Sequence, residues 1–189
     1  IGSVLLLIVT SPILLIAAIA IKHEDGGPVF YKQRRVGRKG EIFECYKLRS
    51  MVVNADEIKA TMSADTNESD GVLFKMKNDP RITKCGRFHR RYSIDELPQL
   101  VNVLKGDMSL VGPRPLPMRD FDRLESWHKK RYLVLPGITG LWQVSGRSDL
   151  DFDDLVRLDF LYLERWSPFL DLTILLKTIP AVLAKRGAY

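Results

Sequence analysis

An almost unbroken apolar stretch runs from Val4 to Ile21. Its eighteen residues are enough to reach across the hydrocarbon core of a bilayer as a helix. A secretory signal fits poorly, because the stretch lacks a basic start and no small-residue cleavage site follows it. A buried core helix also fits poorly, because such a helix is rarely apolar on all sides. The pattern therefore predicts a membrane helix.

Pro12 lies at the centre of this stretch, directly after Ser11. Proline removes a backbone hydrogen bond and clashes with the carbonyl four residues earlier, so it kinks or breaks a helix. The Ser11 hydroxyl can bond a freed carbonyl in place of water, which makes the break tolerable in lipid. From these residues alone, a kinked span and a re-entrant hairpin that leaves by the face it entered are equally good interpretations.

After Gly27 the pattern changes. Residues 28–31 and 41–48 have the pattern of two strands, the second alternating as a half-buried strand does. Between them, residues 32–40 form a basic turn, and we expect most of its charges at a solvated hairpin tip. The polar residues 54–70 predict a loop or a short exposed helix.

Three helices are expected in the second half of the chain. Ser93 and Glu96 have the spacing of a capping box, and the helix they open should stop near Gly106. Residues 149–166 have helical periodicity. Residues 169–184 are apolar but interrupted, which favours an amphipathic helix lying on a membrane or on the core. We therefore predict one helix-rich α/β domain with a small β element and a membrane segment.

The charge balance adds information about partners. There are 29 Lys and Arg residues against 23 Asp and Glu, a formal net charge of +6. This excess favours nucleic acid, phosphorylated small molecules or a membrane surface. Two cysteines without a CxxC pattern do not suit a zinc site and fit a reducing, cytosolic compartment.

Asp95 and Glu96 are adjacent carboxylates among arginines. The nearby arginines are Arg87, Arg90, Arg91, Arg114 and Arg147. Guanidinium groups bind phosphate oxygens through paired hydrogen bonds, and adjacent carboxylates can hold a divalent cation or attack phosphorus. The same carboxylates could merely cap a helix and complement its dipole, and spacing alone favours that interpretation. A nucleic-acid partner is not expected, because it would leave this pair and the membrane segment without a purpose.

Five longer segments carry a family resemblance. They are SPILLIAAIAIK, GPVFYKQRRVGRKGEIFECYKLRSM, DPRITKCGRFHRRYSIDELPQLVNVLKGDMSLVGPRPLP, PGITGLWQVSGR and LDFLYLERWS. Together they closely resemble the bacterial sugar transferase family, the monotopic phosphoglycosyl transferases that act on polyprenyl phosphate. The resemblance covers nearly the whole chain, and DELPQL and MSLVGPRP are highly specific.

The resemblance implies an enzyme that moves a hexose-1-phosphate from a UDP-hexose to polyprenyl (undecaprenyl) phosphate. The family's catalytic pair matches Asp95 and Glu96, where the aspartate attacks the β-phosphate, releases UMP and carries the phosphosugar. The family needs Mg²⁺, and the same two carboxylates are the expected metal ligands. This would be the first membrane step of exopolysaccharide or O-antigen assembly, at the cytosolic face of the bacterial inner membrane.

The resemblance also implies which residues bind substrate or phosphate. By motif these are Lys47, Arg49, Arg90, Arg114, Arg147 and Asp159. Ser11 and Pro12 match the break in the family's re-entrant helix. We therefore expect residues 1–22 to be a re-entrant helix-break-helix, truncated at its start, because members usually begin with a basic and aromatic stretch. Residues 23–189 would be a cytosolic catalytic domain with membrane-associated C-terminal helices.

Membrane lipids are expected partners, and a homo-oligomer is left open. Two other functions compete with this one. The first is a membrane-anchored module that binds an anionic ligand, nucleic acid or phospholipid, without turnover. The second is a transferase without a covalent intermediate, in which Asp95 only binds metal. The LWQVSGR segment and the GAY ending resemble members that use glucose or galactose.

Overall fold

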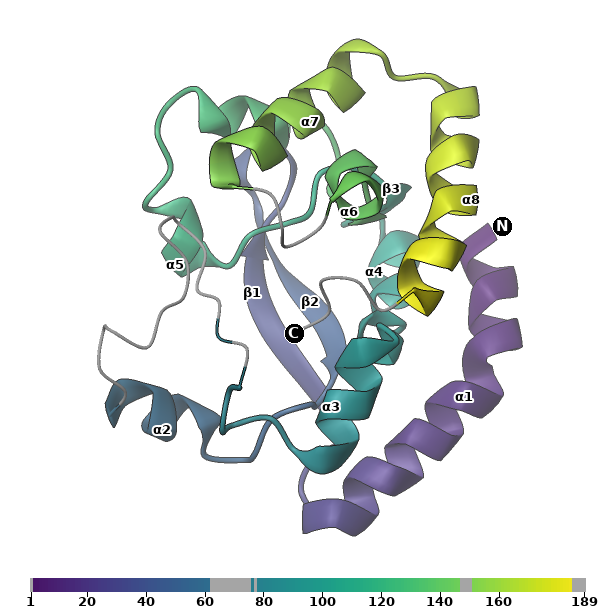
Figure 1. The fold of residues 1–189 in the computed structure, drawn as a ribbon, viewed down its shortest axis with the longest axis vertical. Helices are drawn as coiled ribbons and strands as arrows, with labels where there is room; N and C mark the ends of the chain where they lie inside the picture. Colours follow the sequence, from purple (N-terminus) through teal and green to yellow (C-terminus); the bar gives the residue numbers. More distant parts are fainter. Residues whose placement is uncertain (1, 62–75, 77, 147–150, 185–189) are drawn as a thin grey trace.

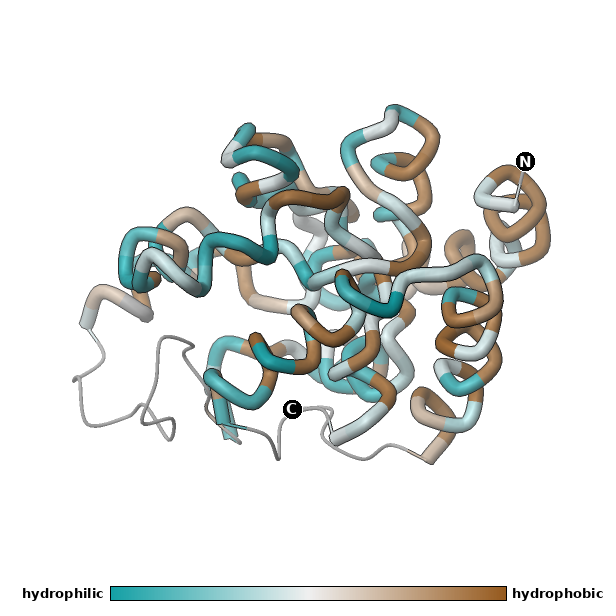
Figure 2. The backbone as a smooth tube through the Cα atoms, turned by 90° about the horizontal axis from the view of Figure 1, so that it is seen from above, coloured by the Kyte–Doolittle hydropathy of each residue, from teal (hydrophilic) through white to brown (hydrophobic). Residues whose placement is uncertain are grey.

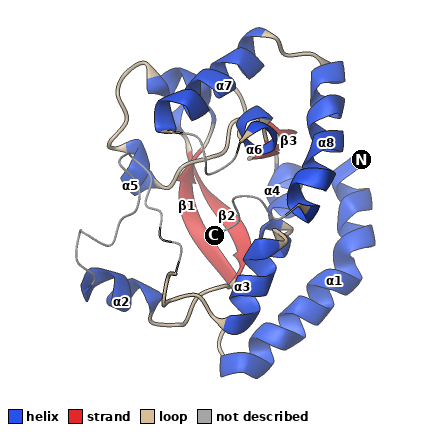
Figure 3. Cartoon of the chain, in the orientation of Figure 1, coloured by secondary structure: helices blue, strands red, loops and turns tan. Residues whose placement is uncertain are grey.

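The computed structural model describes residues 2–61, 76, 78–146 and 151–184. Its elements are α1 (Gly2–Asp25), β1 (Phe30–Val36), β2 (Ile42–Leu48), α2 (Ala55–Thr61), α3 (Lys84–Arg91), α4 (Gln99–Lys105), β3 (Ser109–Val111), α5 (Met118–Phe121), β4 (Gly137–Thr139), α6 (Leu141–Ser145), α7 (Phe152–Glu164) and α8 (Pro168–Leu183). Helices lie around a central two-stranded hairpin (Figures 1 and 3). This arrangement confirms the predicted helix-rich α/β class with a small β element.

Strands β1 and β2 form an antiparallel hairpin that confirms the two predicted strands. The turn is shorter than expected, because β1 continues through Arg35 and Val36. Both residues are buried. The expectation of a solvated tip is therefore wrong for Arg35, whose guanidinium finds partners inside the protein in the Gln33 side chain and the Pro115 carbonyl.

Strands β3 and β4 pair in parallel and bring two glycine-rich loops together. The Gly137 nitrogen donates to the Pro113 carbonyl at 2.9 Å. A Cβ added at Gly137 would lie 2.1 Å from the Gly112 nitrogen, so only glycine permits this approach. The VGPRPLP and PGITG segments thus form one unit that carries Arg114.

Helix α1 is continuous from Gly2 to Asp25, with Pro12 inside it. The Ser11 hydroxyl donates to the Ile8 carbonyl at 2.8 Å, which is the carbonyl that the missing proline N–H leaves free. This confirms the predicted role of Ser11. The helix bends along its length in Figure 1, as proline-containing helices do. The predicted helix-break-helix is not shown, and the re-entrant path stays a prediction.

Most of α1 lies on the outside of the molecule. By length and composition it could cross a membrane, and only 11% of its most apolar window is buried. The tube in Figure 2 is mainly hydrophobic near the N-terminus. At its other end α1 is attached to the rest of the protein. There, the Glu24 carboxylate accepts hydrogen bonds from the backbone nitrogens of Lys84 and Cys85, at 2.8 and 3.2 Å, and Asp25 pairs with Arg49.

The predicted capping box at Ser93 and Glu96 is wrong. Ser93 has a left-handed backbone (φ 54°) and makes no capping hydrogen bond, and a 3₁₀ turn over Ile94–Glu96 precedes α4. Glu96 cannot cap, because other side chains hold its carboxylate. A left-handed serine costs about 1 kcal/mol or more, and this turn carries Asp95 into the interior. The predicted helix end near Gly106 is confirmed.

Helices α7 and α8 confirm the two predicted C-terminal helices within the described residues. One side of α8 is buried, with Ile174 packed beside Val111 and Tyr162. The other side exposes apolar residues at alternating spacings of three and four. These are Phe169, Leu172, Leu176, Ile179 and Leu183. The helix is therefore apolar on its exposed side as well as on its buried side, and the expected amphipathic character is not shown.

Candidate active site

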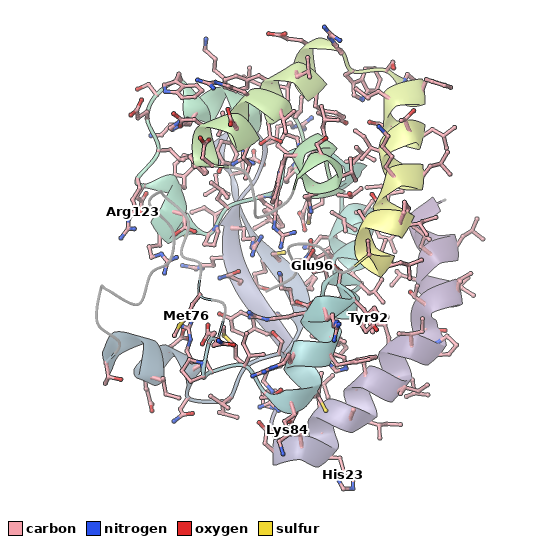
Figure 4. All side chains as sticks on the ribbon, viewed as in Figure 1. His23, Met76, Lys84, Tyr92, Glu96 and Arg123 are labelled. Atoms are coloured by element: carbon pink, nitrogen blue, oxygen red, sulfur yellow. The ribbon has the colours of Figure 1, made fainter. Side chains whose placement is uncertain are left out.

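Glu96 lies near the centre of the molecule, whereas His23 is at its outer edge (Figure 4). The Glu96 Oε1 accepts a hydrogen bond from Lys47 Nζ at 2.7 Å. Arg114 donates to both Glu96 oxygens, with Nη1 at 2.9 Å from Oε2. Burial opposes ionisation of Glu96, but the charges and hydrogen bonds of Arg114 and Lys47 outweigh it and hold the pKa of this carboxyl well below its usual value. Glu96 is therefore an anion between two cations.

The neighbouring carboxylate, Asp95, is in the opposite situation. Its side chain is buried, yet no hydrogen bond or ion pair reaches it from the described part of the chain. Burial raises the pKa of Asp95; the charge of Lys47 opposes this and that of Glu96 reinforces it. Because water and hydrogen bonds normally stabilise a carboxylate, this one is left more basic and more nucleophilic than usual. Two adjacent carboxylates thus differ in partners and in basicity.

Arg90 approaches Asp95 from helix α3. Its Nε donates to the Ser50 hydroxyl at 2.9 Å, and its charge acts on Asp95. The start of α3 is fixed by Thr83, whose side chain accepts from the Gly86 nitrogen. The structure therefore brings Lys47, Arg90 and Arg114 together around the carboxylate pair, as the sequence predicted.

The remaining predicted site residues are paired with other side chains or are not described. Arg49 is held by Asp25 at the end of α1. Asp159 is fully buried and pairs with Arg131, the Nη2 and Oδ2 atoms being 2.6 Å apart. Arg147 lies outside the described residues. The phosphate-binding role of these three residues stays a prediction.

Sequence reasoning missed two buried arginines that hold the loop of Arg114. Arg35 Nη1 donates to the Pro115 carbonyl at 2.7 Å, and Arg131 Nη2 donates to the Arg114 carbonyl at 3.0 Å. Strand alternation would not have found Arg35, because burial along β1 does not alternate and both Arg35 and Val36 are buried. Arg131 stands in a run of basic residues and carries no sequence signal of burial.

The donor set for a metal is small. No group of three or more His, Cys, Asp or Glu side chains in the described residues could hold an ion. Mg²⁺ is commonly bound by only one or two carboxylates, completed by water and substrate phosphates. Asp95 offers free oxygens, and Glu96 would offer oxygens once one of its cations moved to a phosphate. The residues present therefore fit a Mg²⁺ site shared with a phosphorylated substrate.

Residues 1–185 match the protein family described as bacterial sugar transferase. The chain belongs to this family.

Three relatives illustrate the range of the match. The chain is 51% identical to the galactosyl transferase CpsE of Streptococcus agalactiae, over 88% of this chain and 37% of that protein. It is 47% identical to the undecaprenyl-phosphate galactose phosphotransferase of Salmonella typhimurium, over 99% of this chain and 40% of that protein. It is 43% identical to the exopolysaccharide production protein ExoY of Rhizobium meliloti, over 97% of this chain and 82% of that protein. The chain thus spans about two fifths of the length of the first two.

Proposed function

We propose that this protein transfers a hexose-1-phosphate from a UDP-hexose to undecaprenyl phosphate at the membrane, through a phosphosugar carried on Asp95. The observation that carries the proposal is the contrast within the carboxylate pair. Glu96 is bound by two cations, whereas Asp95 is buried beside the same cations with its oxygens free. A free carboxylate among phosphate-binding groups is suited to attack phosphorus.

The first step makes one bond and breaks one. An Asp95 oxygen bonds to the β-phosphorus of the UDP-sugar, and the bond from that phosphorus to the bridging oxygen breaks. UMP leaves with the bridging oxygen. In the second step an oxygen of the lipid phosphate bonds to the same phosphorus, and the Asp95 carboxylate is released. Lys47, Arg90 and Arg114 would bind the phosphate oxygens, because cationic donors stabilise the charge that the transferring group carries.

Glu96 would hold the place of the substrate before it binds. Its carboxylate presents two oxygens to Lys47 and Arg114, as a phosphate group would. When a diphosphate binds, these cations would pass to its oxygens. Glu96 and Asp95 would then be free to hold Mg²⁺, which supplies charge neutralisation of the diphosphate and a better leaving group.

The sugar and the adduct can be tested in one experiment. Purified protein would be mixed with Mg²⁺ and each member of a panel of UDP-sugars, and UMP release would be measured with and without undecaprenyl phosphate. Without acceptor, we expect about one UMP per enzyme and a hexose-phosphate adduct on the peptide that contains Asp95. Asp120→Asn, which alters a buried carboxylate bonded to Arg119, is the matched control and should keep the adduct.

Three results would count against this mechanism. Ligand binding without UMP release would favour a membrane-anchored binding module. Turnover that requires both substrates at once, with no adduct, would favour direct transfer with Asp95 as a metal ligand only. An adduct that persists in Asp95→Asn would place the covalent bond on another residue.

For α1 we propose a re-entrant path, with both ends on the cytosolic face. The support is Pro12 inside an outward-facing apolar helix, together with the Ser11 bond that satisfies the Ile8 carbonyl within lipid. Helix α8 would lie on the same membrane, because its outer side is a stripe of exposed apolar residues.

Topology can be tested by labelling a cysteine in intact cells. Gly2→Cys would be made in a Cys85→Ser background, because Cys85 is partly exposed whereas Cys45 is buried. We expect no label from a membrane-impermeant reagent added outside. Pro12→Leu should make part of the population reactive by straightening the helix. Full labelling without the Pro12 change would show a span.

A further inference from the structure

The loop that carries Arg114 is a run of alternating prolines, Pro113, Pro115 and Pro117. A proline ring fixes φ, so only Arg114 and Leu116 keep a free φ in this run, and of these two Arg114 is the one that reaches Glu96. The group that bonds the Arg114 carbonyl therefore fixes the backbone orientation of this residue, and with it the direction of the side chain. That carbonyl accepts a hydrogen bond from Arg131 Nη2 at 3.0 Å.

Arg131 is itself held by a single carboxylate. Its side chain is 0% exposed and pairs with Asp159, which is 1% exposed, at 2.6 Å. The Nε and Nη1 atoms of Arg131 and the Oδ2 atom of Asp159 have no hydrogen-bond partner among the described residues, so the contact between the two side chains is an ion pair and not an aligned hydrogen bond. The same Nη2 therefore links the Asp159 carboxylate and the Arg114 carbonyl. Asp159 lies on α7, so the link runs from that helix to the loop of Arg114.

We propose that Arg131, oriented by Asp159, is a positioning residue that fixes the Arg114 side chain on the Glu96 side of the active site. Arg131 touches no reacting atom in this scheme and acts only through the backbone of Arg114. The inference rests on the proposed function, since it assigns Arg114 to the donor phosphates. It also gives Asp159 a role without substrate contact, which its burial requires.

Arg35 provides an internal comparison. It holds the next carbonyl along, that of Pro115, at 2.7 Å. The peptide after Arg114 is thus flanked by two buried guanidinium groups that come from unrelated parts of the chain. A loop needed only for packing would not require charged groups on consecutive carbonyls, because buried charges are costly unless paired.

The test is a double-mutant cycle on the rate of UMP release, with wild type, Asp159→Asn, Arg114→Lys and the double variant. All rates would be measured at a temperature where thermal unfolding shows every variant folded. We expect Asp159→Asn to lower kcat/KM about tenfold alone, but about twofold or less in the Arg114→Lys background, because coupled residues are not additive. The proposal would be overturned if Asp159→Asn lowered kcat/KM by the same factor in both backgrounds, or if it caused no loss in the wild-type background.

A control separates positioning from loss of stability. Asp171, in the first turn of α8, accepts a hydrogen bond from Tyr162, which lies one turn beyond Asp159 on α7. Asp171→Asn should weaken the packing of α7 against α8 and leave kcat/KM within about twofold of wild type. If it lowers kcat/KM as much as Asp159→Asn does, the effect is general to α7 and the proposal fails. If wild type releases no UMP from any UDP-sugar, the proposed function fails instead.

Discussion

The surroundings of Glu96 and the outer sides of α1 and α8 distribute charge in opposite ways. Around Glu96, charged side chains are inside the protein: Arg35 and Arg131 are buried and bonded to backbone carbonyls. On the two helices, apolar side chains are outside, with Val9 72% and Phe169 77% exposed. Buried charge is costly unless partners compensate it, and large exposed apolar surface marks a contact. The charges of the first region suit an anionic ligand, and the exposed side chains of the second suit an apolar environment.

The change that should affect the charged region most is Asp95→Asn. It keeps the shape of the side chain but cannot form the bond to phosphorus, so turnover should fall by about a thousandfold or more. If Asp95 only complements a helix dipole, the loss is about 0.3–1 kcal/mol of stability and activity persists. Initial UMP release and thermal unfolding, measured on one preparation, distinguish the two outcomes. Asp120→Asn serves as the control for a lost buried carboxylate.

Arg114→Lys should have the next largest effect. It keeps the charge but loses the planar fork that bonds both Glu96 oxygens, and removal of one such donor costs about 10²-fold in rate. We expect a loss of about ten- to a hundredfold in kcat/KM. Arg119→Lys changes a half-exposed arginine outside the site and should be neutral. Wild-type kinetics for Arg114→Lys would remove the fork from the mechanism.

The buried pair of Asp159 and Arg131 should make stability depend on pH. Burial raises the pKa of Asp159 to about 6, although the charge of Arg131 lowers it, and the ordinary pKa is about 3.9. Tyr132 also interacts electrostatically with Asp159. Because the folded state binds the proton more tightly, this contribution is fully present below pH 3.9 and is lost as the pH rises through 6.

The measurement is the free energy of unfolding of wild type and Asp159→Asn at pH 8 and pH 5. From pH 8 to pH 5, the free energy of unfolding of wild type should rise by about 1.4 kcal/mol relative to that of Asp159→Asn. An unchanged difference would mean that Arg131 keeps Asp159 ionised throughout this range.

The smallest effect is expected on the apolar surface. Leu176 is exposed on α8, so Leu176→Gln should change the free energy of unfolding in detergent by no more than about 0.5 kcal/mol. The same change at the buried Ile174 should cost about 3 kcal/mol. In lipid vesicles, Leu176→Gln should reduce membrane association a few-fold. An unchanged association would place this side of α8 away from the membrane.

Local patterns predicted much of this molecule. The apolar run gave α1, the strand alternation gave the hairpin, and the family motifs gave the cluster of Lys47, Arg90 and Arg114 around the carboxylate pair. The sequence predictions failed where a residue's conformation depends on a partner far away in the chain. Ser93 and Glu96 have the spacing of a capping box, but Lys47 and Arg114 bind the glutamate more strongly than a backbone amide would.

The pairing of Asp159 with Arg131 could not be predicted for the same reason. The family motif marked Asp159 as a substrate or phosphate ligand and nothing marked Arg131, and only the packing of α7 against the 3₁₀ helix His128–Leu133 brings them together. For Arg147, the motif predicted a phosphate ligand, and its position is outside the described residues.

The bond from Glu24 to the start of α3 has a consequence for how the protein folds. Helix α3 is eight residues long, with no acidic residue in its first turn and basic residues in its last, and a helix this short is not stable alone. Its first amides are bonded by a carboxylate that lies 60 residues earlier, at the end of α1. We expect α3 to become stable only after Glu24 has reached it, which requires that long loop to form first. Arg90 would then reach Asp95 only on chains whose membrane segment has already docked.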